Sequence, residues 1–171
     1  LLPQDGVRLE FVLGEVTERL PVEKPITWSF ETALGESTVP VDHEWIMWQV
    51  HPADDPSPPL MNPLISLIIK NGVGRIVARS VYDGIKTQTV IADGLIFPPA
   101  QLFKWEVSFT ISKAGSVKIR RDGALIADYV GPLGCVMIGN PYAKAGIYKW
   151  DTSWFGRIIT LVRFPEHPLV F

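Results

Sequence analysis

The stretch from Trp105 to Val130, WEVSFTISKAGSVKIRRDGALIADYV, decides the fold class. Apolar and polar residues alternate along it with a period of two, and Ala114-Gly115 and Asp122-Gly123 interrupt the alternation. Such alternation is typical of half-buried strands, and an Asp-Gly pair readily takes the positive φ angles of a tight hairpin turn. The stretch therefore predicts three strands in an antiparallel meander.

The same pattern continues on both sides of this stretch. Residues 63–84, PLISLIIKNGVGRIVARSVYDG, predict a hairpin around Asn71 and Gly72, and residues 7–13 alternate as VRLEFVL. No long segment has a helical period, and 15 prolines and 14 glycines would interrupt one. We therefore expect an all-β fold, an antiparallel β-sandwich of the jelly-roll, concanavalin A-like kind.

Length and charge narrow the class of partner. The 171 residues, 47% of them hydrophobic, are enough for one domain spanning residues 1–171. The 16 basic and 18 acidic residues nearly balance, so neither nucleic acid nor a membrane surface is expected as a partner. The start, LLPQDGVRLE, lacks an initiator Met, and we expect that sequence preceding Leu1 has been removed. The sequence does not indicate whether the protein is a monomer or an oligomer.

Three expected strands can be sorted into two faces, because successive side chains on a strand point in opposite directions. One face of each is apolar and suits a core: Val7, Leu9, Phe11 and Leu13; Ile46, Trp48 and Val50; Ala143, Ala145 and Ile147. The other face is mixed: Arg8 and Glu10; Trp45, Met47, Gln49 and His51; Tyr142, Lys144, Gly146, Tyr148 and Trp150. Aromatics mixed with Gln and His are typical of a sugar-binding cleft rather than of a plain solvent face.

Each of these residues also has an ordinary interpretation. The alternatives are a surface histidine for His51, a cross-strand charge pair for Arg8 with Glu10, and an amphipathic strand tyrosine for Tyr148. Arg75 and Arg79 share one strand face, which indicates either additional sugar contacts or a solvated edge strand.

Other chemistries fit the sequence less well. His43, His51, Asp54 and Asp55 match no known ligand spacing, so we expect neither a metal nor a cofactor. A glycosidase needs two carboxylic acids that face each other across a cleft, and the strand-borne spacing Glu-x-Asp-x-x-Glu is absent.

Three segments resemble, in sequence order, the signature motifs of one enzyme family. RLE at Arg8, QVH at Gln49 and YAKAGIY from Tyr142 resemble R-[ST]-E-L-R, Q-[IV]-H and Y-F-K-A-G-x-Y-N-Q of the alginate lyases of polysaccharide lyase family 7. Related glucuronan lyases and heparin lyase I carry similar elements. Val12 and Lys149-Trp150 depart from the alginate pattern, and the third segment looks closer to the glucuronan-lyase-like branch.

The resemblance implies a metal-independent β-elimination on an acidic polysaccharide of the alginate or glucuronan type. Arg8 and Gln49 would hold the uronate carboxylate, His51 would accept the C5 proton, and Tyr148 would protonate the leaving oxygen. Histidine ordinarily titrates near about pH 6.5 and tyrosine near about pH 10, so the first suits a base and the second an acid.

The remaining positions would bind substrate. Glu10 would orient Arg8, and Lys144 would contact a neighbouring carboxylate or lower the pKa of Tyr148. Trp45 and Tyr142 would offer flat surfaces to sugar rings, with Arg75 and Arg79 in further subsites. The resemblance also implies a secreted or extracellular protein. The alternative is a non-catalytic carbohydrate-binding jelly roll of a larger cell-surface or phage-tail protein.

Overall fold

The computed structural model describes residues 7–12, 20–35, 43–52, 63–135, 141–149, 160–165 and 169–170, with only the backbone of 7–12 and 169–170. These residues form thirteen strands and no helix. The strands are β1 Val7–Val12, β2 Pro25–Leu34, β3 Trp45–His51, β4 Ile65–Lys70, β5 Val73–Tyr82, β6 Ile85–Ile96, β7 Leu102–Thr110, β8 Ser116–Arg121, β9 Ala124–Val130, β10 Gly134–Cys135, β11 Tyr142–Lys149, β12 Thr160–Arg163 and β13 Leu169–Val170.

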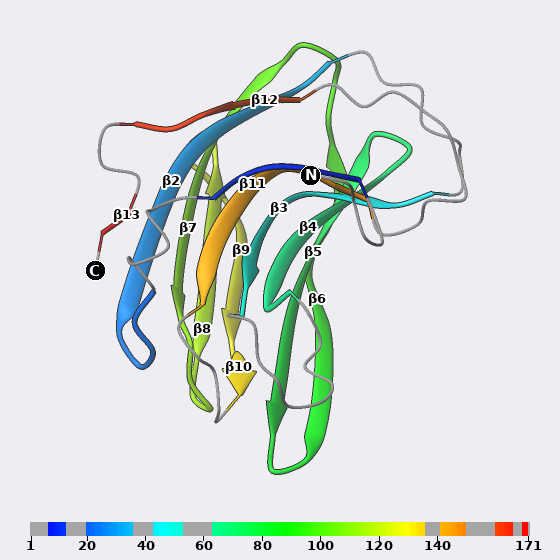
Figure 1. Cartoon of the computed structure of the whole chain (residues 1–171). Coiled ribbons are helices and arrows are strands. Elements are labelled where there is room, and N and C mark those ends of the chain that lie inside the picture. The colour runs from blue at the N-terminus through cyan, green and yellow to red at the C-terminus, as the bar shows by residue number, and fades with distance from the viewer. Residues whose placement is uncertain are drawn as a thin grey trace.

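The strands form two sheets that pack as curved layers (Figure 1). In the described part of the chain, one sheet has seven strands in the order β1-β11-β3-β4-β5-β10, with β6 also paired to β5. The other has six in the order β12-β2-β7-β8-β9, with β13 also paired to β2. All pairings are antiparallel apart from that of β10 with β5. The predicted antiparallel β-sandwich is confirmed.

The hairpin turns lie where the sequence predicts them. Asn71 and Gly72 join β4 to β5 with φ angles of 55° and 71°, and Asp122 and Gly123 join β8 to β9 with φ angles of 53° and 81°. Two successive residues with positive φ give a turn whose twist matches that of the strands it connects. The predicted meander of β7, β8 and β9 is also present.

Aromatic side chains from three strands interlock between the sheets. Trp28 and Phe30 of β2 stack at 4.0 Å between ring centroids, and Trp48 of β3 meets Trp105 of β7 edge-on at 5.6 Å. The Trp105 indole N–H donates to the Thr32 hydroxyl at 2.8 Å, so this buried donor is satisfied. Because Trp48 is fixed in the core, the next residue along β3, Gln49, lies on the opposite face of the sheet.

An irregularity in β3 changes which of its residues face the core. Ile46 lies opposite Ile68 of β4, yet Trp48 lies opposite Leu67, so Met47 is an extra residue and forms a β-bulge. The bulge moves Ile46 onto the face that carries Gln49 and His51 and leaves Met47 in the core. The face assignment predicted for Ile46 and Met47 is therefore wrong.

Among the described residues, no helix has the length and apolar character needed to cross a bilayer.

Candidate active site

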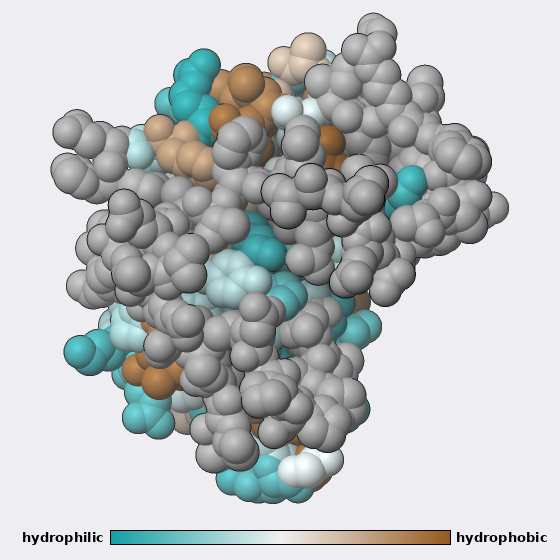
Figure 2. Space-filling view, in the orientation of Figure 1, coloured by the Kyte–Doolittle hydropathy of each residue, from teal (hydrophilic) through white to brown (hydrophobic). Residues whose placement is uncertain are grey.

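Polar side chains gather on the face of the seven-stranded sheet that lies opposite the core. Strand β11 runs between β1 and β3, and its pairing places Tyr142 opposite His51 and Lys144 opposite Gln49. Residues directly opposed across an antiparallel pair have Cβ atoms about 5 Å apart. We call this surface the site face and define it by Gln49, His51, Tyr142, Lys144 and Tyr148. In the orientation of Figure 1, the described surface over β3 and β11 is hydrophilic (Figure 2).

Arg8 and Glu10 join this arrangement through backbone register. Arg8 of β1 pairs with Tyr148 of β11, and Glu10 pairs with Gly146, in a ladder without irregularity. The side chains of β1 lie outside the described part of the structure, so Arg8 and Glu10 are placed by their pairing alone.

His51 is held in one tautomer by a backbone contact. Its Nδ1 lies 2.6 Å from the carbonyl oxygen of Pro52, the residue that follows it. A carbonyl oxygen only accepts hydrogen bonds, so Nδ1 must carry the proton and donate it. In the neutral imidazole the lone pair is then on Nε2.

Lys144 and His51 both contact the ring of Tyr142. The His51 and Tyr142 ring centroids lie 5.4 Å apart, and the Lys144 ammonium nitrogen lies 4.7 Å from the Tyr142 centroid, within the range of a cation–π contact. Gln49 is only 1% exposed and Lys144 only 6% exposed. Burial of an amide and an ammonium on the sheet face opposite the core is uncommon, because polar groups on such a face are ordinarily exposed to water.

Tyr148 rests on a small apolar cluster separate from the main core. Ile46, Ile68 and Val77 form this cluster on the site face, and the Tyr148 ring packs against it. This packing holds the Tyr148 ring in place on the site face. The bulge at Met47 turns Ile46 to this face, and Ile46 lies opposite Tyr148 in the pairing of β3 with β11, whose register shifts between Ala145 and Tyr148.

Trp45 does not belong to the site face. It is 2% exposed and lies in the main core cluster with Trp28, Phe30 and Trp48. The prediction that Trp45 stacks on a sugar ring is therefore wrong. The physical reason is the bulge at Met47, which cannot be recognised in the sequence.

Arg79 lies on the same sheet but is fixed by the protein itself. Its Nη1 donates to the Pro63 carbonyl at 3.0 Å and the Ser66 hydroxyl at 2.9 Å, and its Nε donates to Gln88 Oε1 at 3.0 Å. Burial lowers the pKa of the Arg79 guanidinium below its ordinary value, and the positive charge of Arg75 lowers it further. Arginine stays protonated even so, and with 8% of its surface exposed Arg79 is a structural cation rather than a sugar ligand.

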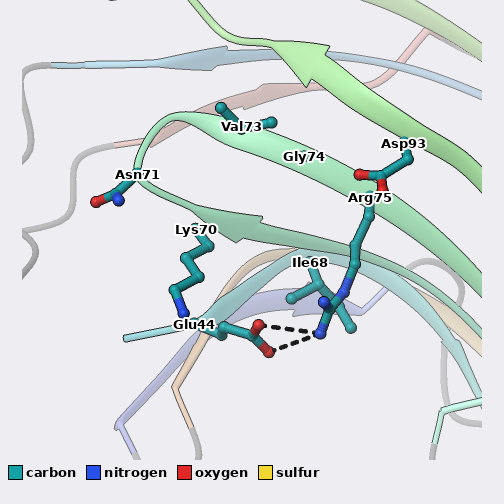
Figure 3. Close-up of a pocket in the computed structure, with 8 residues that line it drawn as sticks. All are labelled: Glu44, Ile68, Lys70, Asn71, Val73, Gly74, Arg75 and Asp93. Carbon is teal, nitrogen blue, oxygen red and sulfur yellow. Dashed lines mark hydrogen bonds and ion pairs between the residues drawn. The ribbon is translucent and has the colours of Figure 1, made fainter. Parts of the chain in front are cut away.

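Arg75 is engaged by an acid that sequence reasoning missed. Its Nη2 lies 2.9 Å from Oε1 and 3.0 Å from Oε2 of Glu44, the residue just before β3 (Figure 3). Sequence reasoning also missed Ser66, which lies opposite Gln49 and accepts from Arg79. Neither residue matches a motif, and only the pairing of β3, β4 and β5 brings them to the site face.

No group of three or more metal-ligating side chains occurs within the described ranges. Asp54 and Asp55 lie outside those ranges.

Comparison with protein-family models finds no match, and neither does comparison with curated protein sequences. Solved structures do share the fold. An endo-β-1,4-glucuronan lyase from the fungus Trichoderma reesei aligns with a TM-score of 0.65 at 10% identity, over 83% of this chain and 67% of its own. The family 7 alginate lyase A1-II′ in complex with product gives 0.61 at 17% identity, over 93% and 70%.

An alginate lyase from Pseudomonas aeruginosa aligns with a TM-score of 0.50 at 20% identity, over 82% of this chain and 64% of its own. The chain thus spans about two thirds of the length of these structures. At such low identities the likeness shows the fold. The resemblance to polysaccharide lyases drawn from three short motifs is therefore confirmed at the level of the fold.

Proposed function

We propose that the site face catalyses β-elimination in a uronate-containing polysaccharide of the alginate or glucuronan type. One observation carries the proposal: His51, with Nδ1 donating to the Pro52 carbonyl, lies in one cross-strand group with Tyr142, Lys144 and Gln49. That group shares its face with Tyr148. A base with a fixed tautomer and a phenol on one surface are the two proton-transfer groups that the reaction requires.

The carboxylate of the uronate is the first obstacle to the reaction. The C5 proton is weakly acidic because the adjacent carboxylate is already negative, and removal of the proton places more charge on that group. Gln49 is proposed to donate a hydrogen bond to the carboxylate, and Arg8, paired with Tyr148 across β1 and β11, to supply a positive charge. Donors fixed before the reaction stabilise the enolate-like intermediate in the way an oxyanion hole does.

His51 Nε2 is proposed to take the C5 proton. The Pro52 carbonyl orients the ring from the other side, and it also stabilises the imidazolium that forms, because Nδ1–H is already donating to it. Contact with the Tyr142 ring further restricts the orientation of the imidazole.

Tyr148 is proposed to give its phenolic proton to the glycosidic oxygen as the C4–O bond breaks. The electron pair of the C5–H bond forms the C4=C5 double bond, and the electron pair of the C4–O bond leaves on the oxygen that Tyr148 protonates. Proton exchange with solvent then restores His51 and Tyr148. In epimers whose C5 proton faces the other way, Tyr148 can serve as both base and acid.

The remaining groups bind and orient the polymer. Lys144, held over Tyr142, is proposed to attract the carboxylate of a neighbouring sugar, and Tyr142 to contact a sugar ring. Glu10 is proposed to orient Arg8, with which it shares a strand. These side chains supply acid, base and charge, so the proposed reaction uses no cofactor. Because such polymers are met outside cells, we place the protein in the extracellular space.

The test is to mix the protein with alginate, glucuronan, heparin and other uronate polymers and to follow ultraviolet absorbance. β-Elimination conjugates the new C4=C5 bond with the carboxylate, so absorbance rises with at least one polymer. Binding of a polymer across a broad pH range without any rise in absorbance would refute catalysis and support a carbohydrate-binding jelly roll instead.

A further inference from the structure

A hollow lies at the end of the β4–β5 hairpin, on the same face of the seven-stranded sheet as the site face. It has a volume of about 280 Å³ and eight lining residues: Glu44, Ile68, Lys70, Asn71, Val73, Gly74, Arg75 and Asp93. Figure 3 shows that they come from three places: the approach to β3, the β4–β5 hairpin and strand β6. We call this hollow the hairpin pocket.

Charge in the hairpin pocket is balanced. Arg75 donates to both carboxylate oxygens of Glu44, and the Lys70 side chain extends toward the same carboxylate (Figure 3). A second acid, Asp93, lies at the opposite wall and accepts from the Gly94 N–H at 2.8 Å. Two carboxylates therefore accompany the two cations that line the pocket.

This balance discriminates between sugars. Because Glu44 and Asp93 offset Arg75 and Lys70, the pocket has no net positive charge to attract the carboxylate of a uronate, and that carboxylate would lie near two like charges at a cost in free energy. The hydroxyls of an uncharged sugar both donate and accept, so they can use the carboxylate oxygens, the Asn71 amide and the Arg75 guanidinium together. Ile68 and Val73 supply apolar surface for the ring itself.

Register places the pocket on a path from the proposed catalytic tyrosine. Tyr148 pairs with Ile46, Ile46 with Ile68, and Ile68 with Arg75, which forms one row across four strands. Neighbouring strands lie roughly 4.8 Å apart, so Arg75 is about 14 Å from Tyr148 along the row. A polysaccharide that follows this row from Tyr148 reaches the hairpin pocket a few sugar rings away.

We infer that the hairpin pocket is a subsite for an uncharged sugar, and that the substrate is a heteropolysaccharide in which uronates are interspersed with neutral sugars. This inference rests on the proposed lyase function and makes it more specific. Cleavage takes place at a uronate beside Tyr148, while a neutral ring occupies the pocket and selects the polymer.

The experiment compares two polymers with the same uronate. One is unbranched β-1,4-glucuronan, and the other has glucuronate alternating with or separated by neutral hexoses. The wild-type protein gives a kcat/KM per cleavable bond at least about fivefold higher on the mixed polymer, because a charge repulsion is absent from the pocket. An equal or higher value on the homopolymer overturns the inference and leaves the lyase proposal standing.

Two isosteric variants test the cause. Glu44→Gln and Asp93→Asn each remove one negative charge from the pocket, so each lowers the preference for the mixed polymer by roughly three- to tenfold. Glu106→Gln, which removes an equivalent exposed acid from the six-stranded sheet, leaves the preference unchanged. If the two pocket variants behave like Glu106→Gln, the pocket does not select the sugar and the inference is wrong.

A binding measurement separates the two proposals. Calorimetry with oligosaccharides of equal length compares the homopolymer and the mixed polymer on His51→Ala, in which turnover is expected to be at least about 100-fold slower. Tighter binding of the mixed oligosaccharide, weakened in the His51→Ala, Asp93→Asn double variant, supports the subsite. Tighter binding of the pure uronate oligosaccharide overturns it. Failure of the wild-type protein to make unsaturated product from any polymer overturns the lyase proposal, whichever oligosaccharide binds better.

Discussion

The outward faces of the two sheets both carry charged residues, but the cross-strand partners and the burial of these residues differ. On the six-stranded sheet, opposite charges face each other across neighbouring strands, and we call this the ion-pair face: Glu31 with Lys104 and Arg163, Glu106 with Arg120, and Lys118 with Asp128. Most of these side chains are about half exposed or more. Such exposed pairs contribute little to the free energy of unfolding, and their charged groups keep this face hydrated.

On the site face the cross-strand neighbours of Lys144 and Arg8 are neutral polar residues. Lys144 faces Gln49, Arg8 pairs with Tyr148, and Tyr142 faces His51. Gln49, Lys144 and Arg79 are nearly fully buried, whereas Lys104, Lys118 and Arg120 are not. The comparison teaches that the partner across the strand and the degree of burial, more than the residue type, distinguish the proposed catalytic face from the ion-pair face.

The largest expected effect is that of Tyr148→Phe on activity. The variant removes one oxygen and leaves the ring on its cluster of Ile46, Ile68 and Val77, so the fold persists. Without the phenolic proton the glycosidic oxygen must leave as an alkoxide, and the rate of unsaturated-product formation falls by roughly 10² to 10⁴-fold. Tyr129→Phe on β9 is the matched control, because it removes a hydroxyl that donates to the Pro132 carbonyl far from the site face. Equal activity of the two variants would mean that Tyr148 is not the acid.

Arg79→Met has the next largest effect, and it acts on stability. The substitution leaves the Pro63 carbonyl, the Ser66 hydroxyl and Gln88 Oε1 without their donor. The bonds to Pro63 and Ser66 are buried, whereas Gln88 is exposed. Buried acceptors that lose a charged donor cost about 2 to 3 kcal/mol, which chemical denaturation measures as a lower free energy of unfolding. The same measurement on Arg120→Met gives a loss below about 0.5 kcal/mol, since the Arg120 side chain is 43% exposed and its ion pair is open to solvent. Similar losses at the two positions would contradict the difference in burial.

The third prediction concerns how the affinity for the polymer depends on salt, and it distinguishes a lysine of the site face from one of the ion-pair face. If Lys144 attracts a substrate carboxylate, the apparent affinity for the polymer falls several-fold as ionic strength rises from about 0.01 to 0.15 M, because the screening length shortens from roughly 30 to 8 Å. Lys144→Met flattens this dependence, whereas Lys118→Met on the ion-pair face does not. An affinity that is insensitive to salt in the wild type would remove Lys144 from the substrate site.

The smallest effect concerns the ion-pair face alone. A double-mutant cycle on Glu106 and Arg120, whose charged atoms lie 3.8 Å apart, gives a coupling free energy below about 1 kcal/mol that vanishes in high salt. A coupling well above that value would show that this face is organised as tightly as the site face.

Local pattern accounts for the fold and for part of the site. Alternation and the turn pairs Asn71-Gly72 and Asp122-Gly123 identify strands and hairpins because both signals lie within a few residues of one another. Gln49, His51, Tyr142 and Lys144 also follow from alternation, since β3 is regular from Trp48 onward and β11 pairs regularly with β1.

The failures have long-range causes. The bulge at Met47 depends on how β3 pairs with β4, so Trp45 could not be assigned to the core from its own strand. The partners of Arg79 come from Pro63, Ser66 and Gln88, on segments that only the folded sheet brings together. Glu44 becomes relevant only through its contact with Arg75, 31 residues away.

The most direct test of the central claim is the initial rate of unsaturated-product formation by His51→Ala on a polymer that the wild type cleaves. Where the C5 proton faces His51, the account predicts a fall of at least about 100-fold, because the base proposed for that epimer is lost, with the rate of the ion-pair-face control Arg120→Ala within about twofold of the wild type. A His51→Ala protein that remains folded and cleaves the polymer at close to the wild-type rate would contradict the claim that the site face performs the elimination through His51.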